Sequence, residues 1–204
     1  MMPRLKHSRP LKGIAGLKRK LTKSFRVTGK KIYLRPITIE DATRRYCSWM
    51  NDPAVVRYTE SRYSRKTVAG LERYIASANK GTNNFFFAIV EKKSDRHIGN
   101  IKIESGVNPF WDHLVAELGL IIGEKSCWGL GFGTEAIRLM TRFCFNILKV
   151  RKVTAQCYSI NVGSAKAFRA AGYVQECLRR ANARYNGKQI DLLLFGAINP
   201  RFKR

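Results

Sequence analysis

Three glycines alternate near the middle of the chain, at Gly129, Gly131 and Gly133, where an apolar run ends and an amphipathic pattern begins. Because glycine has no Cβ, backbone N–H groups can approach a ligand closely there. The first N–H groups of a helix lack intrahelical partners and lie at the positive end of its dipole. The pattern therefore predicts an anion site suited to phosphate, to which the Thr134 hydroxyl could add a hydrogen bond.

Two common phosphate-binding loops do not fit these glycines. A Walker A loop requires Lys-Ser or Lys-Thr directly after its last glycine, and neither pair follows here. The dinucleotide fingerprint G-x-G-x-x-G requires a glycine where Thr134 stands, and it lies early in its domain, whereas this loop lies past the middle of the chain. A glycine-rich turn that binds no ligand is the remaining alternative for the loop taken alone.

Residues 126–131 read S-C-W-G-L-G and resemble the acyl-CoA pyrophosphate loop, Q/R-x-x-G-x-G/A, of the GNAT N-acetyltransferases. The first position departs from that pattern, with Ser126 in place of Gln or Arg and Lys125 as the nearby charge. The resemblance implies that acetyl-CoA is the co-substrate, held at its pyrophosphate by the loop and along its pantetheine arm by the preceding strand. The residues implied are Leu120, Ile121, Ile122, Cys127, Trp128, Gly129, Leu130, Gly131, Gly133 and Thr134.

Two further segments agree with this resemblance. The N-terminal combination of L-R-P (34–36) with W-x-N-D-P-x-V-x-x-Y (49–58) is similar to the start of the Rim-type branch, which includes acetyltransferases of ribosomal-protein N-termini. Residues 161–173 resemble the family's C-terminal motif N-x-x-S/A-x-x-x-Y/F-x-x-x-G-F. The motif implies that Asn161 hydrogen-bonds the cofactor, although an Asn at a helix start is also a good cap. Together the three segments cover residues 31–198.

Acyl transfer to an amine requires a proton acceptor. Glu117 is the candidate base, because it is an ionisable residue inside an otherwise apolar strand just before the implied pantetheine stretch. Glu104, on the neighbouring predicted strand, is the reserve candidate. The alternative for Glu117 is an outward-facing or salt-bridged strand residue.

The departing thiolate requires stabilisation or a proton. Many family members place Tyr where this chain has Phe168, which cannot donate a proton. Ser164, one helical turn earlier, resembles the serine used in the Rim branch, and Tyr158 and Tyr173 are alternatives. A mechanism without an acid also remains open, because a thiolate is a tolerable leaving group at neutral pH.

The elements that must position these residues alternate between strand and helix patterns, which predicts one mixed α/β domain of about seven strands and at least four helices. The resemblance implies a GNAT fold, a mostly antiparallel sheet that is splayed at the acyl-CoA site. Strands are expected at residues 32–37, 85–91, 97–104, 115–122, 150–158, 173–178 and 190–198. Helices are expected at residues 38–49, 64–80, 131–148 and 161–171, and a basic loop at 179–188 with a turn at Asn186-Gly187.

Residues 1–31 are expected to form a basic arm, partly helical or disordered, before a domain at residues 32–204. The arm contains eleven Lys and Arg residues and no Asp or Glu. Ile14, Leu17, Leu21 and Phe25 fall at helical spacing within it. The arm could bind a polyanion such as the ribosome, RNA or an anionic membrane. The alternative is a solvated tail whose apolar residues cap the domain.

Bulk composition limits the kinds of partner and site that the protein can have. The 204 residues suffice for one domain with a full core, and the formal net charge of +25 favours anionic partners. Five widely spaced cysteines without a C-x-x-C pair indicate reduced thiols, and three scattered histidines give no metal-ligand spacing. The chain shows no secretory signal, so a cytoplasmic location is expected.

We therefore expect an acetyl-CoA-dependent N-acetyltransferase that needs no metal and acts as a monomer or a homodimer. Its acceptor is either a small amine or amino sugar, including nucleotide-linked amino sugars, or a protein N-terminus. The alternative function is a non-catalytic binding module that its arm tethers to RNA, the ribosome or a membrane.

Overall fold

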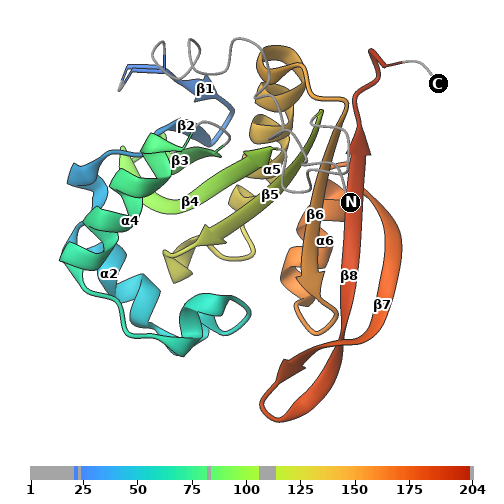
Figure 1. The fold of residues 1–204 in the computed structure, drawn as a ribbon. Helices are drawn as coiled ribbons and strands as arrows, with labels where there is room; N and C mark the ends of the chain where they lie inside the picture. The colour runs from blue at the N-terminus through green and yellow to red at the C-terminus, as the bar shows by residue number, and fades with distance from the viewer. Residues whose placement is uncertain (1–20, 23, 82–83, 106–113, 203–204) are drawn as a thin grey trace, which may run out of the picture.

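The computed structural model describes residues 21–22, 24–81, 84–105 and 114–202, which form one sheet with helices on both faces (Figure 1). Its strands are β1 (Val27–Thr28), β2 (Ile32–Pro36), β3 (Asn84–Glu91), β4 (Arg96–Ser105), β5 (Val115–Ile122), β6 (Lys152–Tyr158), β7 (Val174–Tyr185) and β8 (Lys188–Ile198). Its helices are α2 (Arg44–Asn51), α3 (Pro53–Val56), α4 (Val68–Lys80), α5 (Phe132–Phe143) and α6 (Val162–Ala170). Short helical turns are η1 (Ile39–Asp41), η2 (Glu60–Tyr63), η3 (Lys125–Cys127) and η4 (Cys144–Leu148). The predicted mixed α/β class is confirmed, with eight strands among the described residues rather than about seven.

The sheet has the order β1-β2-β3-β4-β5-β6-β8-β7, and every neighbouring pair except one is antiparallel. The exception is β5 with β6, which run parallel and pair over only three positions, from Val115↔Lys152 to Glu117↔Thr154. Both strands continue beyond that point without pairing with each other, so the sheet opens between them. This opening is the feature around which the site is built.

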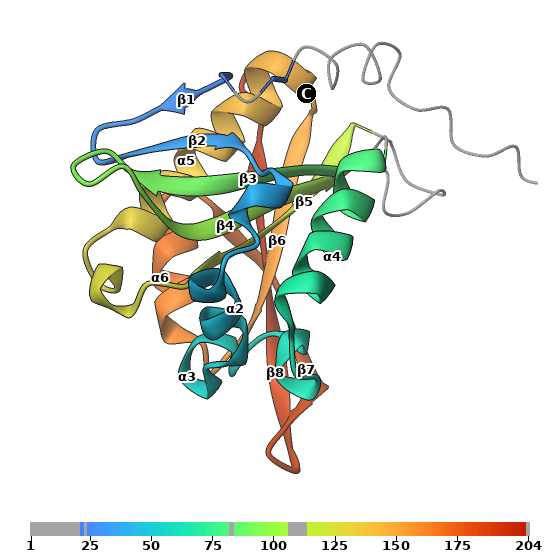
Figure 2. The ribbon, with the colours of Figure 1, turned by 90° about the vertical axis from the view of Figure 1, so that its left-hand side faces the viewer.

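Helices cover the two faces of the sheet in separate layers (Figure 2). On one face, α5 and α6 pack against the sheet through residues such as Ile137, Met140 and Phe168. On the other face, α2 and α4 pack through residues such as Trp49 and Ile75. Because both faces are covered, the central strand β3 reads as a continuous apolar run, with only its end residues half-buried.

The N-terminal part of the described chain belongs to the folded domain. β1 pairs antiparallel with β2, and the Phe25 ring contacts Phe143 and Phe87 at centroid distances of 6.0 and 6.3 Å. Leu21 also packs on the same core. Both side chains are half-buried, so this part of the expected arm packs against the domain. The rest of the expected arm, residues 1–20, lies outside the described residues.

The prediction of a basic loop at residues 179–188 is wrong. β7 continues to Tyr185 and turns through Asn186 and Gly187 into β8, forming a long hairpin that projects from the sheet (Figure 1). The two-residue turn itself is confirmed, with φ values of 47° at Asn186 and 77° at Gly187. The sequence signal was hidden because both faces of β7 are largely exposed, so the strand lacks alternating apolar residues.

Local sequence explains several helix ends. The helix expected at residues 38–49 is divided: the Thr38 backbone N–H donates to the Asp41 carboxylate at 2.8 Å, and the short turn η1 begins there. α2 then starts after its own cap, Thr43.

Within the described ranges, no helix is long and apolar enough to cross a membrane. All five cysteines are free thiols.

Candidate active site

The glycine loop between β5 and α5 has an open main-chain surface. Gly129 and Gly131 adopt φ values of 74° and 82°, a left-handed conformation that side chains disfavour. A Cβ built at either glycine would meet no atom within 4 Å. Gly131 caps α5 without a side-chain hydrogen bond, so the first turn of the helix keeps its backbone donors. The loop can therefore receive an anionic group at the start of α5, and the diphosphate of acetyl-CoA fits that requirement.

Residues far away in the sequence support this loop. The Lys31 ammonium donates to the Leu130 carbonyl at 2.9 Å, and the Trp128 indole donates to the Ile122 carbonyl at 2.8 Å. Lys125, the expected nearby charge, instead forms an ion pair with Asp52 at 2.6 Å. Lys31 is therefore the cation that contacts the loop. Sequence reasoning missed it because 99 residues separate it from Leu130.

The other loop residues differ in what they can present to a ligand. Cys127 is buried in the core, so only its main chain could contact a cofactor. Trp128 and Leu130 are exposed, and Thr134 is half-buried in the first turn of α5. Gly133 lies over the end of β5, because a Cβ there would be 3.7 Å from Ile122 Cγ1 and 3.8 Å from Leu120 Cδ1. The loop thus adjoins the strand that was predicted to pair with pantetheine.

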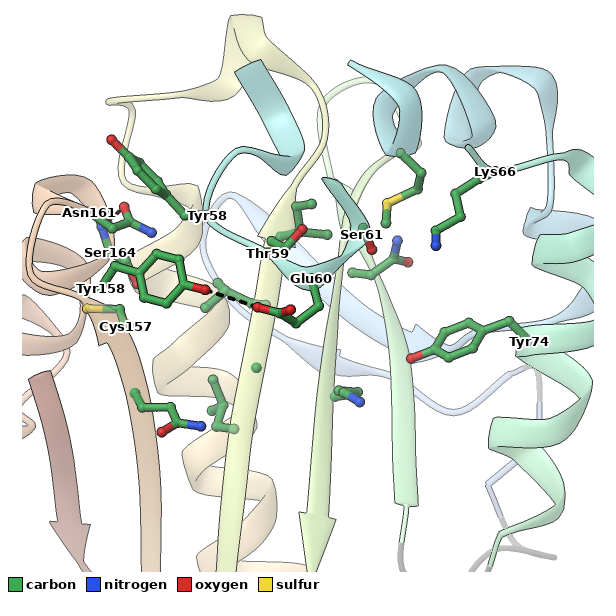
Figure 3. Close-up of a pocket in the computed structure, with 18 of the residues that line it drawn as sticks. Tyr58, Thr59, Glu60, Ser61, Lys66, Tyr74, Cys157, Tyr158, Asn161 and Ser164 are labelled. Atoms are coloured by element: carbon green, nitrogen blue, oxygen red, sulfur yellow. Dashed lines mark hydrogen bonds between the residues drawn. The ribbon is translucent and has the colours of Figure 1, made fainter. Parts of the chain in front are cut away.

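A cavity of about 940 Å³ occupies the opening between β5 and β6 (Figure 3). The strands contribute Leu118, Gly119, Leu120, Ile121, Gln156, Cys157 and Tyr158 to its lining. Helices from opposite faces also line it, through Ser164 and Phe168 of α6 and through Leu71 and Tyr74 of α4. The cavity therefore passes between the parted strands and can be reached from both layers. None of residues 125–134 lines it, so the loop and the cavity are neighbouring parts joined through β5.

Asn161 and Ser164 both line this cavity. The Asn161 side-chain oxygen accepts a hydrogen bond from the Ser164 backbone N–H at 3.2 Å, so Asn161 caps α6. Phe168 packs behind them, stacked on Phe195 at a centroid distance of 5.5 Å. Burial raises the pKa of the neighbouring Cys157 thiol more than its hydrogen bond with Ser164 lowers it. The predicted Asn161–Ser164 motif is thus brought to the cavity wall, where the Ser164 side chain is half-buried.

Three glutamate carboxylates lie at different positions relative to the cavity. Glu117 is half-buried at the last paired position of β5 and accepts a hydrogen bond from Gln156 Nε2 at 3.0 Å. It does not line the cavity itself but connects to it through Gln156. Glu104, the reserve candidate, is bound to Lys102 at 2.6 Å. Glu60, in η2, is the carboxylate that does line the cavity, and sequence reasoning missed it because it lies in a short polar turn.

An aromatic cluster with one arginine closes one side of the cavity. Tyr158 donates to the Glu60 carboxylate at 3.0 Å, and Arg62 donates to the Tyr158 phenol oxygen at 3.2 Å. The Arg62 guanidinium also lies 5.8 Å from the ring centroid of Tyr185, in the projecting hairpin. Tyr173, another candidate acid, lies away from the cavity with its hydroxyl 2.8 Å from Thr141, and burial raises its pKa. Of the two alternative tyrosines, only Tyr158 reaches the site.

The floor of the cavity contains an unsatisfied donor. Asn100, in β4, is 3% exposed, and its Nδ2 group has no hydrogen-bond partner among the described residues. His97 Nε2 lies 2.9 Å from both the Gly99 carbonyl and Asn100 Oδ1. Because a carbonyl can only accept, Nε2 carries the proton, and Asn100 must present its oxygen there. The Asn100 amide N–H groups are therefore left for a ligand or a water molecule.

The described residues contain no group of three or more His, Cys, Asp or Glu side chains that could hold a metal ion. The groups that the described site offers are main-chain donors, hydroxyls, carboxylates and cations. An open anion site adjoins a cavity that holds carboxylate and phenol groups. This combination suits the transfer of an acyl group from a phosphate-bearing carrier to a nucleophile.

Comparisons with known proteins agree with this arrangement. Residues 31–174 match the family model described as an acetyltransferase (GNAT) domain. The chain is 25% identical over 181 residues to "Probable N-acetyltransferase YjcK" of Bacillus subtilis, covering 84% of this chain and 96% of that protein.

Solved structures share the fold. The ribosomal-protein-S5-alanine acetyltransferase of Vibrio fischeri superimposes with a TM-score of 0.73 at 20% identity, covering 89% of this chain and 100% of the other. The spermidine N-acetyltransferase of Vibrio cholerae, in complex with CoA and spermine, superimposes with a TM-score of 0.72 at 19% identity, covering 84% and 97%. The resemblance seen in the three sequence segments is confirmed. The chain belongs to the GNAT family and is an acyl-CoA-dependent N-acetyltransferase.

Proposed function

We propose that the protein transfers the acetyl group of acetyl-CoA to a primary amine bound in the cavity between β5 and β6. The observation that carries the proposal is the parting of these strands after Glu117 and Thr154, beside an open glycine loop. The unpaired edge of β5 can hydrogen-bond an extended pantetheine arm, while the amine reaches the same opening from the side of α4. Membership of the GNAT family supports acetyl-CoA as the donor, and the volume of the cavity supports an acceptor of substantial size.

The cofactor contacts follow from the open donors of the site. We assign the diphosphate to the main chain of Gly129, Leu130 and Gly131 at the start of α5, with Lys31 supplying the adjacent positive charge. We assign the pantetheine arm to the main chain of residues 120–122. Asn161, whose oxygen caps α6, retains its Nδ2 donor for that arm, because no hydrogen bond to this group is found among the described residues. A backbone N–H of β5 would polarise the thioester carbonyl.

The reaction forms a bond between the amine nitrogen and the carbonyl carbon and breaks the carbon–sulfur bond. The nitrogen must lose a proton, and we propose that a carboxylate accepts it, either Glu60 directly or Glu117 through a water molecule, with Gln156 only orienting the Glu117 carboxylate. The sulfur leaves as a thiolate, which the Ser164 or Tyr158 hydroxyl could protonate. Phe168 cannot perform that step, although it stands at the position where many family members have Tyr.

The acceptor belongs to one of two classes. A protein N-terminus is supported by the fold shared with the S5-alanine acetyltransferase, and a small amine by the fold shared with the spermidine acetyltransferase. We also propose that the basic N-terminal segment binds a polyanion, because residues 1–20 contain seven Lys and Arg residues and no acid. Deleting residues 1–20 should then reduce RNA or ribosome binding and its dependence on salt.

The direct test combines cofactor binding with an acceptor screen. Calorimetry should show one CoA bound per chain, and a thiol-release assay with acetyl-CoA should detect turnover on at least one amine class. The screen should include peptides with free N-termini, polyamines and amino sugars, with N-acetylated peptides as the control. CoA binding without turnover on any amine would favour the non-catalytic binding module, and failure to bind CoA would overturn the assignment of the site.

A further inference from the structure

The charges that line the cavity are strongly unbalanced. Five cationic side chains line it, and Glu60 is the single carboxylate among its described lining residues. The cations are Arg65, Lys66, Arg73, Lys102 and Arg179. They come from the segment before α4, from α4 itself, from β4 and from β7, so they surround the cavity rather than forming one surface stripe.

Most of these cations lack a carboxylate partner within the protein. Lys102 is paired with Glu104 at 2.6 Å. The side chains of Arg65, Arg73 and Arg179 form no ion pair or hydrogen bond with another described residue, and among the described residues the Lys66 ammonium donates only to the Ser64 hydroxyl. Like charges held around one cavity repel one another and repel a cationic ligand, whereas an anionic group would be attracted by all of them. The cavity is therefore suited to a ligand that carries negative charge.

β7 has an irregular backbone where it borders the cavity, and this irregularity supports a functional role for the cations there. The strand contains a bulge between Arg179 and Ala183, and both of these residues and Asn182 line the cavity. Ala181, in the bulge, adopts a left-handed φ of 51°, and its N–H is held by the Asp191 carboxylate at 2.9 Å. Bulges commonly redirect side chains beside active sites. Here Arg179 lies at one end of the bulge and lines the cavity.

Asn100 provides a second, independent indication of a ligand. Its Nδ2 donor is buried and has no hydrogen-bond partner among the described residues, and Asn100 is one of the residues that line the cavity. Buried donors in folded proteins nearly always have a partner, so an oxygen of a ligand or of a water molecule is expected nearby. Carboxylate and phosphate oxygens are acceptors without donors, which suits both this amide and the guanidinium groups.

We propose that the acceptor is a primary amine with an anionic group close to it, a carboxylate or a phosphate. The proposal rests on the proposed acetyl transfer and names the chemical class of its acceptor. Glu60 faces the ammonium group of this acceptor, while Arg65, Arg73 and Arg179 bind its anionic group. An acidic peptide N-terminus and a small phosphorylated amine both have this chemistry, and a polyamine does not.

The test measures binding to the CoA-loaded protein by calorimetry, so that it does not depend on turnover. Three peptides differ only after a shared N-terminal serine: Ser-Glu-Glu, Ser-Gln-Gln and Ser-Lys-Lys, each followed by the same neutral sequence. The acidic peptide should bind about tenfold or more tightly than its Gln counterpart, with a preference that weakens as salt rises. A second comparison measures the affinity for phosphoethanolamine against that for ethanolamine. It shows whether the anionic group is recognised on a small phosphorylated amine or on an acidic peptide.

Variants test whether a preference for the anionic ligand depends on Arg65, Arg73 and Arg179. The triple variant R65Q/R73Q/R179Q should lose the preference for the acidic ligand, and each single variant should lose part of it. Arg180→Gln is the matched control, because Arg180 is the exposed neighbour in the same strand and does not line the cavity. N-acetylation of the acidic peptide should weaken its binding to the parent protein but not to Glu60→Gln.

Three results would overturn the inference. The first is equal affinity for the Glu and Gln peptides together with equal affinity for phosphoethanolamine and ethanolamine. The second is a preference that survives in the triple variant, and the third is tightest binding of the Lys peptide. The arginines are exposed, so the variants are expected to fold, and thermal unfolding checks this. CoA binding is measured first without acceptor. Its loss would count against the proposed function, whereas normal CoA binding without anion preference counts only against the inference about the acceptor.

Discussion

The phenol of Tyr158 donates a hydrogen bond to the Glu60 carboxylate at 3.0 Å, across 98 residues of sequence. Tyr158 ends β6 and Glu60 begins η2, so this bond connects one of the parted strands to the segment that leads to α4 (Figure 3). Arg62 donates to the same phenol oxygen at 3.2 Å. A carboxylate and a phenol are thereby held together at the cavity where the amine is proposed to react.

The first prediction separates the two candidate bases. If Glu60 accepts the proton, Glu60→Gln should lower turnover by about 10²-fold or more, with CoA affinity unchanged. Glu117→Gln should do so instead if Glu117 accepts the proton through a water molecule. Steady-state kinetics, with calorimetry of CoA binding, distinguish the two. Unchanged turnover in both variants would exclude these two carboxylates as the base.

The second prediction concerns the conformation of the glycine loop. Gly131→Ala and Gly172→Ala each force an alanine into the left-handed region, at φ values of 82° and 96°. Each should therefore lose about 1–2 kcal/mol of unfolding free energy. Only Gly131→Ala should also weaken CoA binding, because Gly172 ends α6 and lies outside the loop. Denaturant unfolding and calorimetry measure the two effects separately, and equal CoA affinity in both variants would show that the loop is misassigned.

The third prediction concerns Lys31, whose ammonium contacts the Leu130 carbonyl. Lys31→Met should raise the dissociation constant of CoA by about tenfold, because a charge-assisted contact to the diphosphate is lost. Pantetheine, which has no diphosphate, should bind both proteins equally. Lys30→Met is the matched control, since the neighbouring side chain makes no contact with Leu130. Similar losses in both lysine variants would point to general surface charge instead.

The fourth prediction uses the strained residue in β7. Ala181 has a φ of 51°, and relieving this conformation with glycine should raise the unfolding free energy by up to about 1 kcal/mol, the steric relief exceeding the entropic cost of glycine. Ala183→Gly, two residues later in ordinary extended backbone, should instead lower it by about 0.5–1 kcal/mol. Urea unfolding monitors both variants. A loss of stability in Ala181→Gly would mean that the bulge is not strained.

The fifth prediction concerns the stability of the domain in acid. Burial would raise the pKa of Asp41, but the Arg35 guanidinium, bound at 2.5 and 2.7 Å, and the Thr38 N–H hold it below its usual value. The folded state therefore favours the ionised carboxylate. This contribution is complete above the unfolded pKa of about 3.9 and is lost as the pH falls through the folded value.

Asp41→Asn should consequently lower the unfolding free energy at neutral pH by about 3 kcal/mol, because it leaves Arg35 with little exposure and no carboxylate. The variant should also lose less stability than the parent as the pH falls below about 4. Glu72→Gln, an exposed change on α4, should stay within about 0.5 kcal/mol of the parent at all pH values. Parallel pH curves for Asp41→Asn and the parent would contradict the assignment.

The sequence by itself determined the features that depend on local backbone chemistry. The positive φ values of Gly129 and Gly131, the cap at Asn161 and the Asn186-Gly187 turn all follow from residue types that favour those conformations within a few residues. The order of the three resembling segments then identified the family, and strand and helix periodicity identified most elements. The full length of β7 was not predicted, because the strands of an exposed hairpin do not require alternating apolar residues.

Only the tertiary structure decided which side chains share the site. Lys31 reaches Leu130 and Tyr158 reaches Glu60 because the strand order brings together segments about 100 residues apart. No local sequence pattern encodes that strand order. Within its own segment, each of these residues looks like an ordinary solvent-exposed polar residue. The cations of the cavity likewise become one electrostatic environment only after the sheet opens between β5 and β6, since charge acts through distance in space rather than through separation in sequence.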